Sequence, residues 1–230
     1  AALRKNDYGV VHYDSPDKRG IDVGLIYKKE KFEPIHSENL SVKLINDTSF
    51  YTRDILYVKG LSFENEIHVF VNHWPSRRGG AEQSEHKRIR AAQVLKNKVD
   101  SIVSSNPESR IIIMGDFNDT PQNNSIEKAL NAGESLPPKD LLNLMGSLPS
   151  SAGSHKYKGH WAYLDQLIVS DPVSPIIQFD ATVFFMEWML NEDSKYPGFY
   201  PKRTWSGNFY KGGYSDHLPI FFDICISDTK

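Results

Sequence analysis

Only one cysteine, Cys225, occurs among the 230 residues, so an internal disulfide is excluded. Cys225 lies in an apolar stretch, and we expect it to pack in the core as a small hydrophobic side chain. No run of apolar residues approaches the ~20 that a membrane-spanning helix requires. No signal peptide is recognisable, and the opening residues Ala1 to Tyr8 read as the end of a helix without an initiating Met. We therefore expect a soluble chain whose first strands, and any leader, precede residue 1.

Neither sign of charge is in excess. The 27 Lys and Arg residues against 29 Asp and Glu residues give a formal net charge of -2, so the whole chain has no strong attraction for nucleic acid or anionic membranes. Any polyanion must therefore be held by a local patch. Hydrophobic residues at 39% and charged residues at 24% are typical of a globular protein with a substantial core. We expect a single, N-terminally truncated domain over residues 1–230, present as a monomer.

Hydrophobic patterns predict far more strands than helices. Apolar residues at three- and four-residue spacing predict a long helix over residues 81–104. We expect a second, short helix over residues 125–130. Adjacent strands joined by tight turns favour an α+β fold with largely antiparallel sheets and helices outside. The expected strands are 10–13, 21–27, 42–45, 55–61 and 66–73 as a hairpin, 111–114, 163–169, 181–186 and 218–226, whereas 30–39 is a loop or weak strand, 131–160 the least ordered part and 196–213 a loop.

A carboxylate and a carboxamide follow the apolar strand 111–114. Gly115 breaks the strand, and Asp116, Phe117 and Asn118 come next. Because side chains alternate along an extended chain, Asp116 and Asn118 project to one side and Phe117 to the other. Such an acid can accept a proton or lie near a metal, and the amide can bind a phosphate oxygen. The same residue types are also typical of a simple turn.

Titratable residues lie at the ends of three further predicted strands. His73 ends the second strand of the hairpin, Asp165 interrupts the apolar run 163–169, and Asp216-His217 precede the last strand. Taken singly, His73 could be an edge histidine and Asp216-His217 a turn. Asp165 is harder to dismiss, because a carboxylate inside an apolar strand is rarely buried without a partner. Their recurrence at strand ends favours one shared site.

Four short motifs, in this order, resemble the endonuclease/exonuclease/phosphatase superfamily. They are Asn-His-Trp at 72–74, Gly-Asp-Phe-Asn at 115–118, Leu-Asp-Gln-Leu-Ile-Val at 164–169 and Ser-Asp-His-Leu-Pro at 215–219. One such motif is a weak signal, but four in order are a strong one. The superfamily includes DNase I-like nucleases, abasic-site endonucleases, inositol polyphosphate phosphatases and sphingomyelinases. The resemblance implies a four-layer α/β sandwich, with two mainly antiparallel sheets flanked by helices, and a divalent-metal-dependent phosphoester hydrolase.

The resemblance also implies roles for individual residues. Asp116 resembles the family acid that positions or deprotonates the attacking water, and Asn118 resembles the amide that holds the phosphate. His217 resembles the histidine that contacts the scissile phosphate, with Asp165 orienting it. A carboxylate beside an imidazole favours its charged form and fixes its tautomer. His73 resembles a second histidine on the phosphate side.

The expected metal site is incomplete. Asp216 resembles a metal-site carboxylate, with Asp116 and Asn118 completing the set that we expect to hold Mg²⁺ or Mn²⁺, since such ions prefer oxygen ligands. The family's opening strands supply an Asn and a Glu that is the principal metal ligand. This chain begins after both, and its glutamates within 30–38 lie beyond that place. We therefore expect this chain to be weakly active or inactive.

The substrate is left open by the sequence. Trp74, Arg77 and Arg78 follow His73 directly, and an Arg pair could clamp a phosphate, although a solvated loop is also ordinary. Tyr157 lies in a basic and aromatic stretch that suits a nucleic acid strand, and equally a sugar phosphate or a lipid head group. We expect a phosphodiesterase or nuclease. The alternatives are a phosphomonoesterase, a sphingomyelinase-type lipid phosphodiesterase and a non-catalytic phosphate-binding module.

Overall fold

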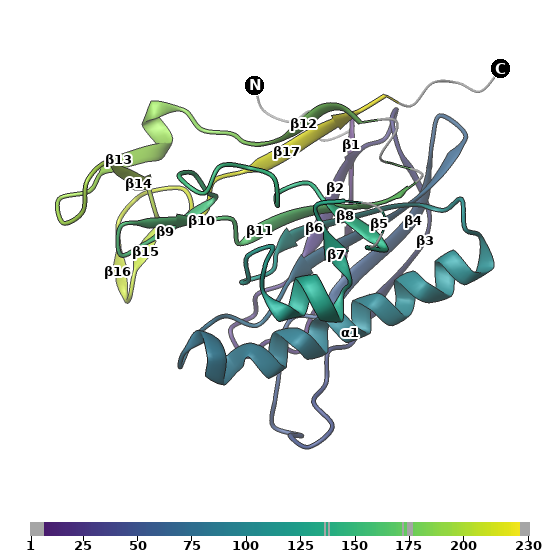
Figure 1. Cartoon of the computed structure of the whole chain (residues 1–230), viewed down its shortest axis with the longest axis horizontal. Coiled ribbons are helices and arrows are strands. Elements are labelled where there is room, and N and C mark those ends of the chain that lie inside the picture. Colours follow the sequence, from purple (N-terminus) through teal and green to yellow (C-terminus); the bar gives the residue numbers. More distant parts are fainter. Residues whose placement is uncertain (1–6, 136, 138, 172, 174–176, 226–230) are drawn as a thin grey trace.

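One large sheet dominates the α+β fold (Figure 1). The computed structural model describes residues 7–225 except 136, 138, 172 and 174–176. The sheet has seven strands in the order β3-β4-β5-β6-β11-β8-β7. Neighbouring strands are antiparallel except the pairs β5–β6 and β7–β8, which are parallel. The strands are β3 (Glu33–Leu40), β4 (Ile55–Ser62), β5 (Asn65–His73), β6 (Arg110–Asp116), β7 (Ala132–Gly133), β8 (Leu141–Asn143) and β11 (Asp165–Ser170).

Helix α1 (Ala81–Ser105) covers one face of this sheet, together with the short π-helix η1 (Ser125–Ala129). Small and apolar side chains at three- and four-residue spacing form the buried stripe of α1. They pack against alternate residues of the central strands, because successive side chains of a strand point to opposite faces. The largest core cluster includes Ala91, Ala92, Leu95 and Val99 of the helix, Tyr57, Phe70, Ile111 and Ile113 of the sheet, and Ile126 of η1.

The opposite face of the sheet packs against a two-stranded ribbon of β12 (Ile177–Val183) and β17 (Ile220–Ile224). Ile220 and Phe222 of β17 face this second core, whereas Phe221 between them is 44% exposed. Strands β1 (Tyr8–His12) and β2 (Gly24–Lys28) form another antiparallel pair. The expected α+β class with sheets and an outer helix is therefore confirmed. In the described residues, no helix combines the length and hydrophobicity needed to cross a membrane.

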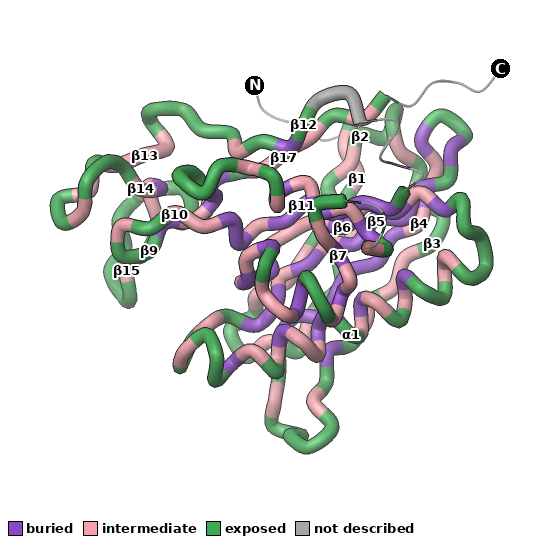
Figure 2. The backbone as a smooth tube through the Cα atoms, viewed as in Figure 1, coloured by how far each residue is buried: buried purple, intermediate pink, exposed green. Residues whose placement is uncertain are grey.

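Three short hairpins project together from one end of the main sheet (Figure 1). Figure 2 shows that these hairpins are mostly exposed or half-buried, whereas the centre of the sheet is buried. The short 3-10 helix η3 (Glu187–Met189) precedes the second of them. The hairpins are β9 (His155–Tyr157) with β10 (His160–Ala162), β13 (Leu190–Glu192) with β14 (Phe199–Pro201), and β15 (Trp205–Ser206) with β16 (Phe209–Tyr210).

The long helix and the hairpin of β4 and β5 form as the sequence predicts, whereas several weaker expectations are wrong. Of the two alternatives for residues 30–39, the strand is correct, since β3 pairs with β4, with a shift of register between Pro34 and His36. Residues 42–45 form no strand and carry only an isolated bridge between Leu44 and Asp47. Residues 131–160 hold three short strands and the first residue of a fourth, and 196–213 hold three.

The two chain ends also differ from expectation. Tyr8 begins strand β1, and residues 1–6 of the expected helix end lie outside the described residues. Cys225 is exposed and not in the core, because strand β17 has already ended at Ile224.

Position 115 requires glycine for two reasons, its backbone conformation and the atoms packed against it. Its φ is 129°, in the region that favours glycine, and a Cβ atom there would overlap the carbonyl oxygen of Asn72 on β5. We expect Gly115→Ala to lower the free energy of unfolding by more than about 2 kcal/mol, which urea denaturation would measure. Gly24→Ala is the matched control, since its Cβ would meet only ordinary contacts, the nearest at 3.6 Å. Equal stability of both variants would contradict this reading of Gly115.

Candidate active site

Strand register brings three of the predicted residues to one level. His73 is opposite Asp116 in the parallel pair of β5 and β6, and Asp165 is opposite Asp116 in the antiparallel pair of β11 and β6. Neighbouring strands lie about 4.8 Å apart, so these three side chains are close neighbours. The Nε2 atom of His73 lies 3.4 Å from Oδ2 of Asp116.

His217 joins this row from the loop that precedes β17. Its Nδ1 lies 2.6 Å from Oδ2 of Asp165, and an isolated bridge pairs its backbone with His155 of β9. Burial alone would lower the pKa of His217. The hydrogen bond and charge of Asp165 outweigh burial and raise that pKa to about 9. His217 is therefore an imidazolium at neutral pH, and its Nε2–H remains available after Nδ1–H has been donated to Asp165.

The carboxyl group of Asp116 has a raised pKa. Burial, and then the negative charge of Asp165, raise its pKa above the ordinary value. The pKa of His73 moves the other way, to about 4, because burial and the positive charge of Arg53 disfavour the imidazolium. Asp116 therefore faces a neutral imidazole on one side and the Asp165–His217 pair on the other. A carboxylate with a raised pKa in this setting is suited to general-base chemistry.

Asn118 positions Asp116. Its backbone N–H donates to Oδ1 of Asp116 at 2.8 Å, and its Nδ2 donates to Oδ2 at 3.1 Å. Nδ2 also lies 3.1 Å from the carbonyl oxygen of Trp74. These bonds require a φ of 51° at Asn118, a conformation that asparagine tolerates better than most residues. Phosphate binding by Asn118 stays a prediction.

A buried ion pair fixes the end of β5 beneath the site. Nη1 of Arg53 lies 2.9 Å from Oδ2 of Asp17, and both side chains are almost fully buried. The same guanidinium donates to the carbonyl oxygens of His73 at 3.0 Å and Trp74 at 2.5 Å. The sequence alone does not reveal Arg53, because an isolated arginine in a polar segment gives no periodic signal and its partner lies 36 residues away.

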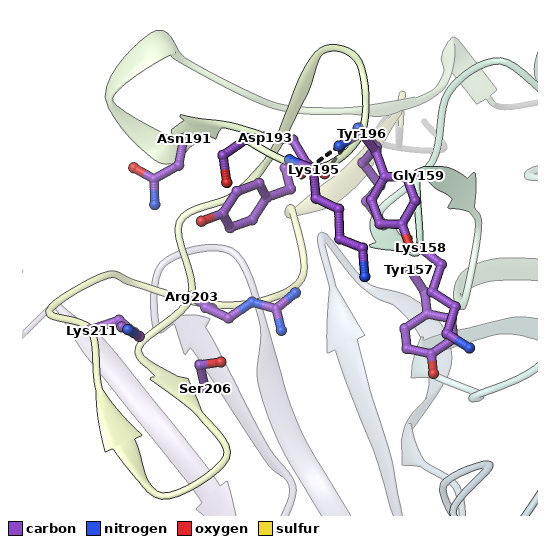
Figure 3. Close-up of a pocket in the computed structure, with 13 residues that line it drawn as sticks. Tyr157, Lys158, Gly159, Asn191, Asp193, Lys195, Tyr196, Arg203, Ser206 and Lys211 are labelled. Carbon is purple, nitrogen blue, oxygen red and sulfur yellow. Dashed lines mark hydrogen bonds and ion pairs between the residues drawn. The ribbon is translucent and has the colours of Figure 1, made fainter.

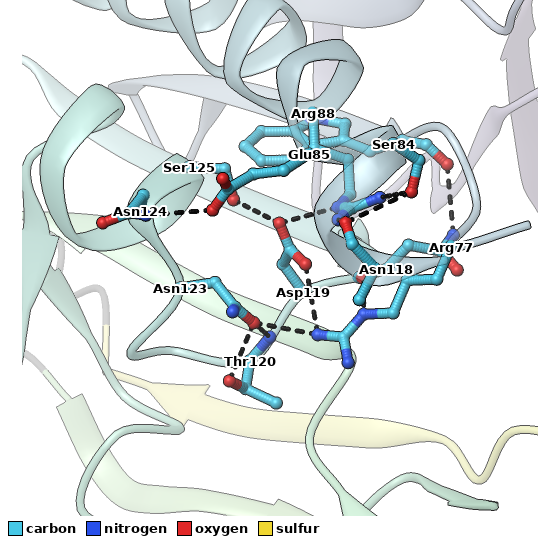
Figure 4. A network of polar contacts seen from close by, with 12 residues as sticks. Arg77, Ser84, Glu85, Arg88, Asn118, Asp119, Thr120, Asn123, Asn124 and Ser125 are labelled. Carbon is cyan, nitrogen blue, oxygen red and sulfur yellow. Dashed lines mark hydrogen bonds and ion pairs between the residues drawn. The ribbon is translucent and has the colours of Figure 1, made fainter. Parts of the chain in front are cut away.

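A second buried network lies under the loop that carries Asn118 (Figure 4). Asp119 and Arg88 are each 1% exposed, and Nε of Arg88 lies 2.7 Å from Oδ2 of Asp119. Ser125 donates its hydroxyl to the same carboxylate at 2.6 Å. Arg77 donates to Oδ1 of Asp119 at 3.1 Å and to the carbonyl oxygen of Asn118 at 2.6 Å. Arg77, predicted to contact substrate, is therefore engaged in holding this loop.

The remaining predicted residues lie outside the row. Trp74 is 1% exposed and packs against Phe117 with ring centroids 4.4 Å apart, so its ring is a core element with no free face for a substrate. Arg78 lines a separate hollow of about 460 Å³. Tyr157 is 65% exposed and lines another hollow, beyond His155.

His155 is a site residue that the sequence did not reveal. Its ring centroid lies 4.7 Å from that of His217, and its potential ligand atoms cluster with those of His217 and Asp216. Burial, and then the charge of His217, lower the pKa of His155 to about 4. A lone histidine in a polar segment carries no distinguishing pattern, so only the pairing of β9 with the last loop identifies it.

The donor set near Asp116 fits a hard divalent cation. Oxygen atoms of Asp116 and Asp165 and a nitrogen of His217 lie within 4.8 Å of one another. Asp165 is already bonded to the His217 imidazolium, whereas Asp116 has no such bond to His217, and burial and the charge of Asp165 raise its pKa. Asp216 gathers with His155 and not with Asp116. No glutamate belongs to either cluster in the described part of the chain.

Removing the buried carboxylate of Asp119 should destabilise the protein strongly, because Arg88 would remain as an uncompensated buried charge. We expect Asp119→Ala to cost about 3–5 kcal/mol of unfolding free energy, measured by urea denaturation. Asp100→Ala is the control, since its ion pair with Lys96 is half exposed and should contribute less than about 1 kcal/mol. A loss below about 1 kcal/mol for Asp119→Ala would show that this network does not hold the loop.

The sequence model of the Endonuclease/Exonuclease/phosphatase family matches residues 1–225. No curated protein matches the chain. Solved structures similar to it include humanized D. rerio TDP2, with 15% identity and a TM-score of 0.56 over 95% of this chain and 77% of that one.

Two further structures are similar over most of their length. A mannosyl-6-phosphatase of Bacteroides thetaiotaomicron is 12% identical with a TM-score of 0.64, covering 96% of this chain and 78% of that one. The human Nocturnin catalytic domain is 16% identical with a TM-score of 0.53, covering 95% and 74%. These similarities establish the shared fold, and the match over residues 1–225 shows that the chain belongs to the Endonuclease/Exonuclease/phosphatase family.

Proposed function

We propose that this protein is a divalent-metal-dependent phosphoester hydrolase that cleaves phosphodiesters. The observation that carries the proposal is the row in which Asp116, with its raised pKa, adjoins a hydrogen-bonded Asp165–His217 pair. Phosphoester hydrolysis needs a group that takes a proton from water and a cationic donor for the charge that develops on phosphate oxygens. Both lie within one row of side chains here.

Each residue of the row has a chemical task in this proposal. Asp116 accepts the proton of the attacking water, and Asn118 keeps its carboxylate oriented through two hydrogen bonds. The Nε2–H of the His217 imidazolium donates to a phosphoryl oxygen. Asp165 holds the charge and tautomer of His217 through the 2.6 Å bond to Nδ1. His73 stays neutral beside Asp116 and orders the phosphate side of the site.

The metal requirement follows from the same carboxylates. Asp116 is the residue best suited to hold Mg²⁺ or Mn²⁺, because its half-buried carboxylate, unlike that of Asp165, is not hydrogen-bonded to His217. Such an ion, when bound, would offset the negative charge of the phosphate and assist the departure of the leaving oxygen. Since few carboxylates gather here among the described residues, we expect turnover by this chain to be slow but measurable.

The similar solved structures suggest which substrates to compare. One similar structure is a mannosyl-6-phosphatase, and the Nocturnin structure contains a bound sulfate anion. These are properties of those proteins, and their low identity leaves phosphomonoester hydrolysis as an alternative for this chain. A sphingomyelinase-type activity or a non-catalytic phosphate-binding role would give different results in the assay below.

We expect His217→Ala and Asp116→Ala each to lower kcat for bis(4-nitrophenyl) phosphate in Mn²⁺ at least about 100-fold, because each removes a donor or base that acts in the transition state. His86→Ala is the control, since this histidine is exposed on α1. Excess EDTA should abolish turnover by the wild-type protein, and added Mn²⁺ should restore it. Circular dichroism would establish that the variants are folded.

The outcome also separates the alternatives. A folded His217→Ala variant with less than a tenfold loss would reject the assigned role. Faster turnover of 4-nitrophenyl phosphate than of the diester would favour a phosphomonoesterase, and turnover of sphingomyelin alone would favour a lipid phosphodiesterase. No turnover of any of the three would favour the non-catalytic module.

A further inference from the structure

A hollow of about 530 Å³ lies between the three projecting hairpins (Figure 3). Its lining comes from β9 and the turn that follows it, from β13, β14 and the loop between them, and from the segment around β15 and β16. Among the lining residues, five are basic and only Asp193 is acidic. This local excess contrasts with the formal net charge of -2 for the whole chain. The basic residues are Lys156, Lys158, Lys195, Arg203 and Lys211.

The one carboxylate of the hollow is already occupied. Oδ1 of Asp193 accepts the backbone N–H groups of Lys195 and Tyr196, each at 3.0 Å. Its Oδ2 lies 3.6 Å from Nζ of Lys156, and this buried ammonium also donates to the carbonyl oxygen of Pro197 at 2.9 Å. Lys156 and Asp193 therefore interact with each other and with the backbone in the wall of the hollow.

The other four cations have no carboxylate partner within the described residues. For Arg203 the lack of a partner extends to a buried atom, because its Nε–H donates no hydrogen bond to any described residue. A buried, unpaired guanidinium nitrogen is costly. Figure 3 shows the guanidinium of Arg203 and the ammonium of Lys195 both extending into the hollow. An anion placed there would satisfy both.

Aromatic rings accompany these cations. Nζ of Lys158 lies 5.3 Å from the centroid of Tyr157, Nζ of Lys195 lies 5.4 Å from that of Tyr196, and the guanidinium carbon of Arg203 lies 5.7 Å from that of Tyr200. Such cation–π contacts hold the positive groups near the rings. Tyr157 is 65% exposed, so its ring has surface available for stacking.

Strand β9 connects the active site with this hollow. Strand β9 begins at His155, whose ring lies 4.7 Å from that of His217, and ends at Tyr157 on the wall of the hollow. The charge of Arg203 also contributes, after burial and His217, to the lowered pKa of His155. A chain-like substrate with its scissile phosphate at His217 could therefore extend along β9 into the hollow.

We propose that this hollow binds a single-stranded nucleic acid segment next to the scissile phosphate, with its phosphates on Lys195, Arg203 and Lys211 and a base stacked on Tyr157. This inference rests on the proposed function and names its substrate class. Alternating phosphates and bases match a hollow that combines unpaired cations with aromatic rings. A small phosphate ester would use only some of these cations and none of the rings.

The test is binding of a fluorescein-labelled oligothymidylate of about twelve nucleotides, measured by fluorescence anisotropy in EDTA so that no cleavage occurs. We expect Lys195→Ala/Lys211→Ala to weaken binding at least tenfold and to lower the salt slope by about 1.4, at about 0.7 per lost phosphate contact on a single strand. The control Lys29→Ala/Lys43→Ala removes the same charge from exposed positions far from the hollow in sequence and should bind like the wild-type protein.

Tyr157 tests the stacking separately. Tyr157→Ala should weaken binding between about fivefold and 150-fold, whereas Tyr157→Phe, which keeps the ring, should bind within about twofold of the wild-type protein. Loss of binding in Lys195→Ala/Lys211→Ala but equal affinity of both Tyr157 variants would overturn the placement of a base on this ring.

The inference as a whole would be overturned by wild-type protein that does not bind the oligonucleotide, or by equal affinities of the hollow and control variants. Wild-type protein that binds inorganic tripolyphosphate or phosphatidylserine vesicles but does not bind the oligonucleotide would also overturn the inference. That result would indicate a small polyanion or a membrane surface as the ligand. Turnover of bis(4-nitrophenyl) phosphate by the wild-type protein is scored independently. Turnover without oligonucleotide binding rejects this inference alone, whereas binding without turnover rejects the proposed hydrolase.

Discussion

The pairing register of three strands is the constraint on which the site depends. β6 lies between β5 and β11, and the register places Asp116 opposite both His73 and Asp165. A shift of one residue in either pairing would turn a side chain of this row towards the opposite face. Gly115 belongs to the same constraint, because its glycine-like φ and its close approach to Asn72 allow β6 to run beside β5 up to the site.

Buried charges then hold the loops that leave these strands. Arg53 with Asp17 anchors the carbonyl groups of His73 and Trp74, and Arg88 with Asp119 anchors the loop after Asn118. Buried ion pairs are a poor source of net stability because of the cost of desolvation. Their value here is positional, since each pair connects segments distant in sequence directly under a site residue. The row of candidate catalytic residues is thereby preorganised before any substrate arrives.

The sequence predicts the parts of this site that lie at strand ends. His73, Asp116, Asp165 and His217 could be found because each interrupts or borders an apolar run whose period is readable locally. Arg53 and Asp119 could not be found in the same way, because their partners depend on tertiary packing. Arg77 shows the limit of local spacing, since its position beside His73 does not reveal that its guanidinium points at Asn118 and Asp119.

The same limit applies to the projecting hairpins. Residues 131–160 and 196–213 read as loops, and their glycines and aromatic residues conceal short strands that form only by pairing with one another. The basic hollow combines Tyr157 and Lys158 with Lys195, Arg203 and Lys211 from the later hairpins. Its charge could not be predicted from a chain with a formal net charge of -2, because the cations converge only in the folded structure.

The central claim is that Asp165 keeps His217 protonated beside Asp116, and an NMR titration of the histidine ring signals of the metal-free protein tests it most directly. We predict a pKa of about 9 for His217 in the wild-type protein. In Asp165→Asn the raising hydrogen bond and charge are lost and burial remains, so the pKa should fall to about 6.5 or below. A wild-type value at or below about 6.5, unchanged by Asp165→Asn, would contradict the account.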